Sequence, residues 1–367
     1  MSDLANFSAL STTPAQLPVS WYFDPRISQA EERALFQAGP RYVGHELMVP
    51  NSGDFHVLDW LNPGMVLVRG HDGVELLSNV CRHRQALMLK GRGNVQNIVC
   101  PAHRWTYNLE GKLLGAPAFP GNPCLDLSRT GLSRWNGLLF GGTRDVASDL
   151  AAFSLAQDYD FSGHVFDRVL IDHHSYNWKT FMEVYLELYH VLPAHPGLSK
   201  YVDPDNYRWE FGERWSIQEM GIYQKLTTSG SPAYQRYIEA LLRLTGGALP
   251  KYGTVWSCYY PNIMLEWYPF CLVVSTVLPN GPERCVNAVE FYYAEEVALF
   301  EREFVELHQA AYRESAAEDA QLCQMLHDGR AALYRAGIEE SGPYQSPSED
   351  GMVHFHDFVR RAVEPRL

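Results

Sequence analysis

The sequence contains no apolar run long enough to cross a membrane. A transmembrane helix needs about 20 predominantly apolar residues, and no apolar run of this chain reaches that length. No secretory apolar segment follows Met1, so we expect a cytoplasmic protein with no membrane partner. Positive charge is also scarce, because 30 basic residues stand against 43 acidic ones and give a net charge of −13. This balance argues against nucleic acid as a partner.

Nucleotide-binding fingerprints are absent as well. Gly91-Arg92-Gly93 begins like a glycine-rich dinucleotide loop, but Gln96 stands where that motif has its third glycine. No other flavin or nicotinamide motif occurs in the chain. If the protein catalyses a redox reaction, its electrons must therefore come from another protein.

Cysteine is sparse, and its number is odd. Seven cysteines are spread over 367 residues, which does not suit a disulfide framework. We expect reduced thiols, and we expect five of them to be buried packing residues: Cys124, Cys258, Cys271, Cys285 and Cys323. The other two each precede a histidine, in Cys81-x-His83 and, after 16 intervening residues, Cys100-x-x-His103. Thiolate and imidazole together suit zinc or an iron–sulfur cluster.

The order of these four ligands distinguishes a zinc site from an iron–sulfur cluster. The usual zinc-finger order places both Cys before both His, whereas here each pair is mixed. Each pair can therefore give one Cys to one iron and one His to the other, as in a 2Fe–2S centre of the Rieske type. We predict a 2Fe–2S cluster held by Cys81, His83, Cys100 and His103, with structural zinc as the rival.

These motifs resemble the Rieske domain of the Rieske non-haem iron oxygenases, the terminal components of ring-hydroxylating dioxygenases and of related monooxygenases and demethylases. The resemblance rests on three segments, Cys81-Arg82-His83-Arg84, Cys100-Pro101-Ala102-His103-Arg104-Trp105 and Tyr107-Asn108-Leu109-Glu110-Gly111-Lys112-Leu113. It extends over most of the chain. It implies a 2Fe–2S cluster, mononuclear Fe(2+), a head-to-tail homotrimer, and a separate reductase or ferredoxin that delivers electrons from NAD(P)H.

The pattern of predicted elements gives an α+β fold with three parts. Residues 1–40 are a polar arm followed by a helix over 27–37, for which Asp24 is the candidate cap. Residues 41–145 carry short strands and turns such as Asp72-Gly73 and Glu110-Gly111, which predict a small antiparallel β domain, the Rieske domain. Residues 146–367, after a linker at about 143–157, form the catalytic domain.

The catalytic domain is predicted to be helix-grip-like, with an antiparallel sheet and long helices. A helical stretch opens at Asn177 and runs through Leu188, and residues 295 to about 336 are mostly helical. The predicted strands cover residues 169–171, 255–259, 264–267, 271–274 and 286–293.

A second group of ligand-type residues lies in this domain. Glu187 and His190 are three apart, which places them on one helix face. His190 and His195 are five apart, so one continuous helix would point them in different directions. Pro193 disfavours continuation, and a turn after His190 can bring His195 back to the same centre. Two imidazoles and one carboxylate on one face of iron(II) leave positions open for O₂ and substrate.

The family pattern supports this interpretation. The chain matches it at Asn177-Trp178-Lys179, Glu183, His190 and His195, and departs from it at Val184, where the family usually has Asn. Glu187 stands where ring-hydroxylating dioxygenases usually have Asp, which resembles the choline, carnitine and glycine-betaine branch. The resemblance implies that this acid bridges an iron-ligating His to a Rieske His of the neighbouring subunit.

The third iron ligand is a carboxylate from elsewhere in the chain. The segment Glu318-Asp319-Ala320-Gln321-Leu322-Cys323 resembles the family's Glu-Asp-x-x-Leu-Cys, and we predict Asp319, with Glu318 and Asp328 as competitors. Residues 348–356 also resemble the choline branch. We expect His354 and His356 to share one face of a strand, and we assign them no metal.

These features predict a terminal oxygenase that uses O₂ to hydroxylate or oxidatively demethylate a small organic substrate. An aromatic cage for a quaternary ammonium is the favoured substrate site, built from Tyr252, Trp256, Tyr259, Tyr260, Trp267, Tyr268 and Phe270. The same aromatic residues could sandwich a flat substrate, so an aromatic-ring hydroxylating dioxygenase is the alternative. The remote alternative is a Rieske electron carrier with a non-catalytic ligand-binding domain.

Overall fold

The computed structural model describes residues 15–223, 226 and 230–367, and the chain divides into two compact units. One unit is Phe36–Ala151, and the other combines Met1–Leu35 with Ala152–Leu367. The predicted polar arm falls mostly on residues 1–14, which lie outside the described residues. Among the helices that the structure describes, none is long and apolar enough to cross a membrane.

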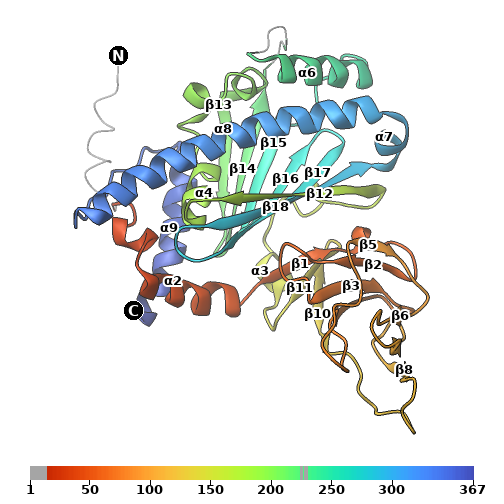
Figure 1. Ribbon diagram of the computed structural model, residues 1–367. Helices are drawn as coiled ribbons and strands as arrows, with labels where there is room; N and C mark the ends of the chain where they lie inside the picture. Colours follow the sequence, from red (N-terminus) through yellow and green to blue (C-terminus); the bar gives the residue numbers. More distant parts are fainter. Residues whose placement is uncertain (1–14, 224–225, 227–229) are drawn as a thin grey trace, which may run out of the picture. The chain divides into compact units, whose positions relative to one another are not determined.

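The unit Phe36–Ala151 consists of small antiparallel sheets (Figure 1). One sheet has the order β1-β11-β10, formed by β1 (Arg41–His45), β11 (Leu138–Gly141) and β10 (Leu132–Trp135). A second has the order β5-β2-β3-β4-β9, formed by β5 (Arg92–Asn94), β2 (Asp54–Val57), β3 (Met65–Arg69), β4 (Val74–Ser78) and β9 (Arg129–Thr130). The third is β6 (Ile98–Val99), β7 (Thr106–Tyr107) and β8 (Leu113–Gly115). The short helix α3 (Val146–Asp149) lies within the predicted linker.

Both predicted turns of this unit are present. Asp72-Gly73 joins the antiparallel strands β3 and β4. Before β8, the Asn108 side chain accepts hydrogen bonds from the backbone N–H groups of Glu110 and Lys112, and Gly111 takes a positive φ of +83°. Asn side chains favour such local backbone bonds, and Gly adopts positive φ without steric cost.

The other unit contains a seven-stranded antiparallel sheet of order β12-β18-β17-β16-β15-β14-β13 (Figure 1). The strands are β12 (His164–His174), β13 (Val202–Phe211), β14 (Trp215–Ile222), β15 (Thr254–Tyr259), β16 (Ile263–Tyr268), β17 (Cys271–Pro279) and β18 (Cys285–Ala294). All five predicted strands lie in this sheet. The sequence analysis missed β13 and β14. The opening of β13, Val202-Asp203-Pro204-Asp205-Asn206, has the composition of a turn, and pairing with β14 holds it in the sheet.

Helices cover one face of this sheet. The 34-residue helix α8 (Arg302–Arg335) and α6 (Pro232–Leu244) share a buried apolar cluster with β14, β17 and β18. Figure 1 shows α8 running across the strands. The other helices of the unit are α2 (Pro25–Glu31), α4 (Trp178–Tyr185), α5 (Val191–Ala194), α7 (Glu295–Phe300) and α9 (Asp350–Val363). Asp24 caps α2 as predicted, because its side chain accepts a hydrogen bond from the Arg26 N–H.

The prediction of a strand at His354 and His356 is wrong, because both residues lie on α9. The apolar residues Met352, Phe355, Phe358 and Val359 recur at helical spacing and are buried. His354 contacts the Tyr260 hydroxyl, and His356 is fully buried.

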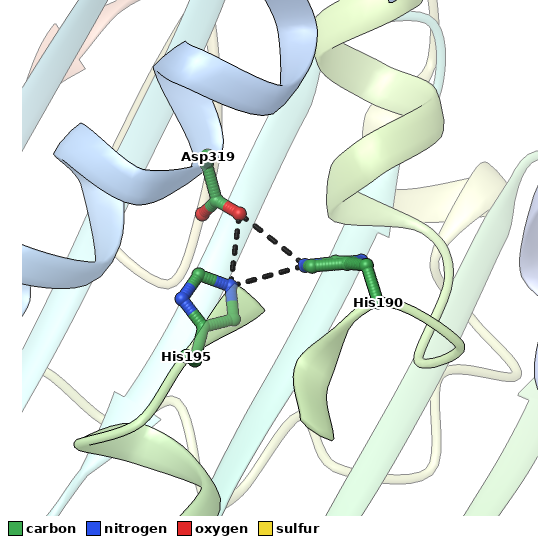
Figure 2. A group of neighbouring side chains, drawn as sticks. All are labelled: His190, His195 and Asp319. Carbon is green, nitrogen blue, oxygen red and sulfur yellow. Dashed lines mark hydrogen bonds and ion pairs between the residues drawn. The ribbon is translucent and has the colours of Figure 1, made fainter. Parts of the chain in front are cut away.

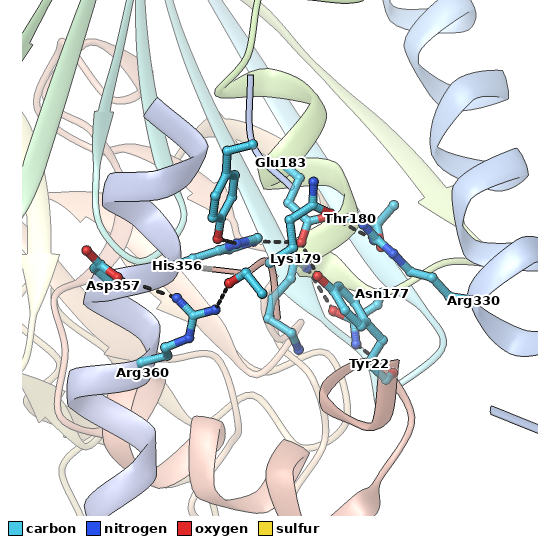
Figure 3. A network of polar contacts seen from close by, with 12 residues as sticks. Tyr22, Asn177, Lys179, Thr180, Glu183, Arg330, His356, Asp357 and Arg360 are labelled. Atoms are coloured by element: carbon cyan, nitrogen blue, oxygen red, sulfur yellow. Dashed lines mark hydrogen bonds and ion pairs between the residues drawn. The ribbon is translucent and has the colours of Figure 1, made fainter. Parts of the chain in front are cut away.

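Buried charge anchors α4, the helix that precedes the second group of ligand-type residues. Glu183 is 2% exposed, and its carboxylate accepts hydrogen bonds from the Tyr22 hydroxyl and from His356 Nε2 at 2.8 Å. Arg330 of α8 forms an ion pair with the same carboxylate at 2.7 Å. Figure 3 shows Glu183 among these three partners. Burial raises the pKa of Glu183, but Arg330 and the hydrogen bonds outweigh burial and lower it to about 2.

A second buried ion pair joins α4 to α2. Lys179 Nζ lies 2.6 Å from Glu31 Oε1, and both side chains are almost fully inaccessible to solvent. The Trp178 indole N–H donates to the other oxygen of Glu31 at 3.0 Å. Helix α2, which precedes the unit Phe36–Ala151, is therefore held against α4 of the larger unit.

Replacement of Glu183 should destabilise the protein strongly. Glu183→Gln leaves the partly buried Arg330 without its anionic partner, and breaking a buried pair in this way costs about 3–5 kcal/mol of unfolding free energy. Because the folded-state pKa is depressed to about 2, the loss should be fully present above about pH 5 and shrink as the pH falls towards 2.

Urea unfolding at pH 7 checks this prediction. Glu303→Gln is a matched control, because Glu303 pairs with Arg243 on the surface, and exposed pairs contribute under about 1 kcal/mol. Equal unfolding free energies for the two variants would contradict the structural role of Glu183.

Candidate metal centres

Two loops of the same construction carry the predicted cluster ligands. In the first loop, the Cys81 N–H donates to the Ala86 carbonyl, and the Cys81 carbonyl accepts from the Gln85 N–H. In the second loop, the Cys100 N–H donates to the Trp105 carbonyl, and the Cys100 carbonyl accepts from the Arg104 N–H. The fourth residue after each Cys takes a positive φ, 55° at Gln85 and 61° at Arg104. Each loop thus wraps tightly around its Cys and presents its His from the same turn.

The ligand atoms of these loops fit a two-iron cluster. Cys81 and Cys100 are both 1% exposed, whereas the imidazole rings of His83 and His103 lie nearer the surface with centroids 4.6 Å apart. His83 Nδ1 is buried and has no hydrogen-bond partner among the described residues, as expected for an atom that binds a metal. Trp105 stacks against the His83 ring and fixes its plane. The two thiols and the two imidazoles are the donor set of a Rieske centre.

The remaining cysteines follow the prediction with one exception. Cys258, Cys271, Cys285 and Cys323 are buried, and burial raises the pKa of each thiol. Cys124 is exposed, so its predicted burial is wrong. It sits in a surface turn in which the Asn122 side chain accepts its backbone N–H.

The second site forms where α4 stops. The helix ends at Tyr185, three residues earlier than predicted, so Glu187 lies in the irregular segment after it and not on a helix face. The three-residue spacing still brings Glu187 to His190: the backbone N–H of His190 donates to Glu187 Oε2 at 3.0 Å, and its Nδ1 contacts Oε1. The chain then forms α5, which contains Pro193 and ends at Ala194, and the C-cap residue His195 places its ring against that of His190.

His190, His195 and Asp319 converge on one point (Figure 2). The two Nε2 atoms are 3.1 Å apart, and Asp319 Oδ1 lies 3.3 Å from the first and 3.0 Å from the second. Asp319 comes from the middle of α8 and the two imidazoles from the segment after α4. Two imidazoles and one carboxylate on one face of a metal are the ligand set of non-haem iron(II) oxygenases.

Carboxylates hold the far side of both rings. Glu187 contacts His190 Nδ1, and Glu318 Oε2 lies 2.7 Å from His195 Nδ1. An ionised carboxylate only accepts hydrogen bonds, so each Nδ1 carries the proton and each Nε2 can bind a metal. Glu318, which the sequence analysis kept as a competing ligand, therefore orients the His195 ring. Asp328 is exposed and accepts a hydrogen bond from Gln324.

The charges of the site also fit a divalent cation. Burial lowers the pKa of His190, but hydrogen bonds to Asp319 and Glu187 outweigh burial and raise it to about 10. Burial raises the pKa of Asp319, but hydrogen bonds to the two imidazoles outweigh burial and lower it to about 2. Three carboxylates thus surround two imidazoles, and this excess of negative charge suits a bound cation.

A cavity of about 370 Å³ adjoins this site. It lies between the sheet and α8, and its lining includes His190, His195 and Asp319. Of the predicted aromatic cage, the lining contains only Trp256 and Tyr268; Tyr252, Tyr259, Tyr260, Trp267 and Phe270 do not line it. Most of its aromatic walls come from residues that the sequence analysis did not select: Phe181, Tyr185, Tyr201, Tyr234, Tyr237 and Tyr312.

Two family models match the chain. The ring hydroxylating alpha subunit (catalytic domain) model covers residues 156–365, and the Rieske [2Fe-2S] domain model covers residues 40–126. The chain belongs to the Rieske non-haem iron oxygenases. Membership in this family confirms the predicted 2Fe–2S cluster and non-haem iron as cofactors and excludes the electron-carrier alternative.

Relatives of this oxygenase match over nearly its whole length. The chain is 57% identical to putrescine 2-hydroxylase of Ralstonia nicotianae, covering 99% of this chain and 100% of the relative. It is 47% identical to putrescine 2-hydroxylase of Bordetella bronchiseptica, covering 99% and 88%. Its fold matches that of a quaternary ammonium Rieske monooxygenase studied for carnitine oxidation and inter-subunit electron transfer, with a TM-score of 0.76, 20% identity, and coverage of 97% and 98%. The predicted α+β fold is confirmed.

The ligand geometry predicts the outcome of removing one carboxylate. Asp319→Ala should lower the iron content of the purified oxygenase from three to two atoms per chain, because the cluster ligands lie in the other unit. The visible absorbance of the cluster should persist, and turnover should be lost.

Asp328→Ala is the control, because this exposed acid lies on the same helix and makes no contact with the imidazoles. It should keep all three irons. Full activity of Asp319→Ala, or loss of iron from Asp328→Ala, would refute the ligand assignment.

Proposed function

We propose that this oxygenase hydroxylates a small aliphatic diamine, putrescine, at its second carbon. The observation that carries the proposal is the cavity beside His190, His195 and Asp319, whose lining combines aromatic rings with four acidic side chains and one arginine. Such a lining favours a cationic substrate, because aromatic faces and carboxylates both attract ammonium groups. The 57% identity to a putrescine 2-hydroxylase over the whole chain supports the same substrate.

The size of the cavity suits this substrate. Its volume of about 370 Å³ is near the lower end of the range of about 300–1,000 Å³ for small-molecule pockets. The apolar members of the lining, among them Leu170, Val289 and Met264, suit the methylene groups between the two ammonium ions.

The reaction needs two electrons and O₂. One oxygen atom enters the C–H bond and the other leaves as water, with two protons consumed. When bound, the mononuclear iron would activate O₂, and the 2Fe–2S cluster would supply single electrons received from a separate reductase or ferredoxin. We propose that His190, His195 and Asp319 hold that iron, while the cavity orients the second carbon towards it and excludes bulk water.

Single turnover tests the proposed function without knowledge of the natural reductase. The purified holoprotein is reduced chemically and mixed with putrescine and ¹⁸O₂, and the products are analysed by mass spectrometry. We expect hydroxyputrescine with one ¹⁸O atom and reoxidation of the cluster that depends on the diamine. A panel with choline, glycine betaine and benzoate covers the other predictions. Formaldehyde from a betaine, or a cis-diol from the aromatic acid, with unchanged putrescine would overturn the proposal.

We further propose that the oxygenase works as a homotrimer in which electrons cross between subunits through Glu187. The proposal is supported by the contact of Glu187 with His190 Nδ1 and by the fold of the quaternary ammonium monooxygenase studied for inter-subunit electron transfer. Glu187 also lines a second surface pocket with Tyr189 and Leu192, which are 64% and 59% exposed. A bridging carboxylate at this surface could accept a hydrogen bond from a cluster ligand of another subunit.

Glu187→Gln should slow electron delivery while both metal sites stay loaded, because the amide cannot act as a charged acceptor between two imidazoles. We expect cluster oxidation in single turnover to be about 10–100-fold slower.

Glu318→Gln is the matched control, because Glu318 holds His195 as Glu187 holds His190. If Glu187 only orients its ring, the two variants should lose activity equally. A specific loss of cluster oxidation in Glu187→Gln supports the bridge.

A further inference from the structure

Glu266 is a charged residue in the middle of the buried strand β16. It is 3% exposed, its neighbours in the strand are aliphatic or aromatic, and its side chain lines the cavity. Trp256, its cross-strand partner on β15, lines the same cavity. The single acid in this strand was visible in the sequence, but only the structure shows that it faces the cavity.

The partners of this carboxylate are neutral. The Tyr268 hydroxyl donates to Oε2 at 2.9 Å, and the Tyr312 hydroxyl donates to Oε1 at 3.1 Å. The Trp256 indole N–H in turn donates to the Tyr268 hydroxyl at 3.0 Å. Among the described residues, no Lys, Arg or His forms an ion pair with Glu266. Buried carboxylates are normally paired with a cation, so this side of the cavity lacks a positive charge that a ligand can provide.

Burial makes the ionised form of Glu266 costly in the free protein. It raises the pKa of the carboxyl to about 7, although the hydrogen bonds from Tyr268 and Tyr312 oppose the rise. A cation placed next to the carboxylate would remove this cost, because an opposite charge favours the ionised form. The surrounding aromatic rings of Trp256, Tyr268 and Tyr312 add faces that attract a cation.

The position of Glu266 relative to the iron ligands limits the shape of the substrate. Tyr312, which binds Glu266, and Asp319 are seven residues apart on α8, so they lie on one helix face roughly 10 Å apart along its axis. In N-methyl oxidation the charged nitrogen is bonded to the carbon that reacts, so that cation must lie beside the iron. In a four-carbon diamine oxidised at the second carbon, the distal nitrogen is three bonds away. A carboxylate displaced from the iron ligands along α8 therefore suits an ammonium that is not bonded to the reacting carbon, such as the distal ammonium of a diamine.

We propose that Glu266, held by Tyr268 and Tyr312, binds the distal ammonium of the substrate and selects a primary diamine over a monoamine or a quaternary ammonium. The proposal rests on the proposed function and names the residue that recognises the second amine. A primary ammonium donates N–H hydrogen bonds to the carboxylate, whereas a quaternary ammonium has no proton to donate. Glu266 is thus a specificity-determining residue, separate from the metal ligands.

Glu266→Gln tests this role, because the amide keeps the size of the side chain and removes its charge. The substrates are putrescine and butan-1-amine, which has the same carbon chain without the distal ammonium. For the wild type we expect kcat/KM to favour the diamine. In the variant we expect the diamine-to-monoamine ratio to fall on the order of 10–100-fold, with iron content and cluster absorbance unchanged.

Glu290→Gln is the matched control. Glu290 is 1% exposed and accepts a hydrogen bond from Tyr292 two residues on, as Glu266 does from Tyr268. Its neighbour Phe291 pairs with Val273, which pairs with Glu266, so Glu290 faces the opposite side of the sheet. This variant should keep the wild-type ratio even if its stability falls.

Calorimetric binding of putrescine and butan-1-amine to the holoproteins separates the two proposals. Tighter binding of the diamine that is lost only in Glu266→Gln supports the role of Glu266, even if the wild type forms no hydroxylated product and the proposed function falls. Hydroxylation of putrescine with an unchanged diamine-to-monoamine ratio in Glu266→Gln overturns the role of Glu266 and leaves the function standing. Equal changes in the Glu266 and Glu290 variants, or no diamine binding by the wild type, also overturn it.

Discussion

The ion pair between Glu183 and Arg330 joins α4, which precedes the two imidazoles of the candidate iron site, to α8, which carries its carboxylate. Glu183 lies on α4, which leads into the segment with His190 and His195, and Arg330 lies on α8, which carries Asp319. Neither segment has a complete ligand set, so the site exists only while the two helices keep their separation and rotation. A buried ion pair holds two helices in place well, because a shift of either helix would leave a buried charge with neither water nor a partner.

Four residues of α8 that contact the cavity, the imidazoles and α4 lie on one face of the helix. Tyr312, Asp319, Cys323 and Arg330 are spaced by seven, four and seven residues, so they lie within roughly 40° of one another around an ideal helix. Tyr312 contacts Glu266, Asp319 meets the imidazoles, Cys323 lies 3.7 Å from the Thr180 carbonyl, and Arg330 pairs with α4. The orientation of α8 about its axis thus fixes Tyr312 in the cavity wall, Asp319 beside the imidazoles and Arg330 against α4.

Local chemistry in the sequence was enough to predict much of this arrangement. The mixed Cys-His pairs indicated the cluster, and the five-residue spacing of His190 and His195 required the chain to change direction between them. Pro193, which was expected to stop the helix, lies within the short helix α5 instead. Asp319 was selected through its resemblance to a family segment, since nothing local separates it from Glu318. Their different roles depend on which acid reaches His195 Nε2 and which reaches Nδ1, and that is decided by the packing of α8 against a segment more than a hundred residues away.

Long-range packing also explains what the sequence did not predict. Consecutive residues of a strand face opposite sides of the sheet, and of the aromatic residues at 252–270 that were selected only Trp256 and Tyr268 line the cavity. Tyr234 and Tyr237 come from α6, a helix that the sequence analysis did not predict. His354 and His356 alternate as strand residues would, but the apolar residues around them repeat with a helical period, and that period decided the local structure.

The cavity is built from two kinds of element. The three residues proposed to hold iron belong to helix α8 and to the segment after α4, while Glu266, Trp256 and Met264 project from the sheet. Glu266 is tied to α8 through Tyr312. Other side chains on the sheet can be exchanged without moving α8, because strand pairing depends on the backbone. Substitutions at sheet residues such as Trp256 and Met264 can therefore change which amine the cavity accepts, while the residues proposed to hold iron stay the same.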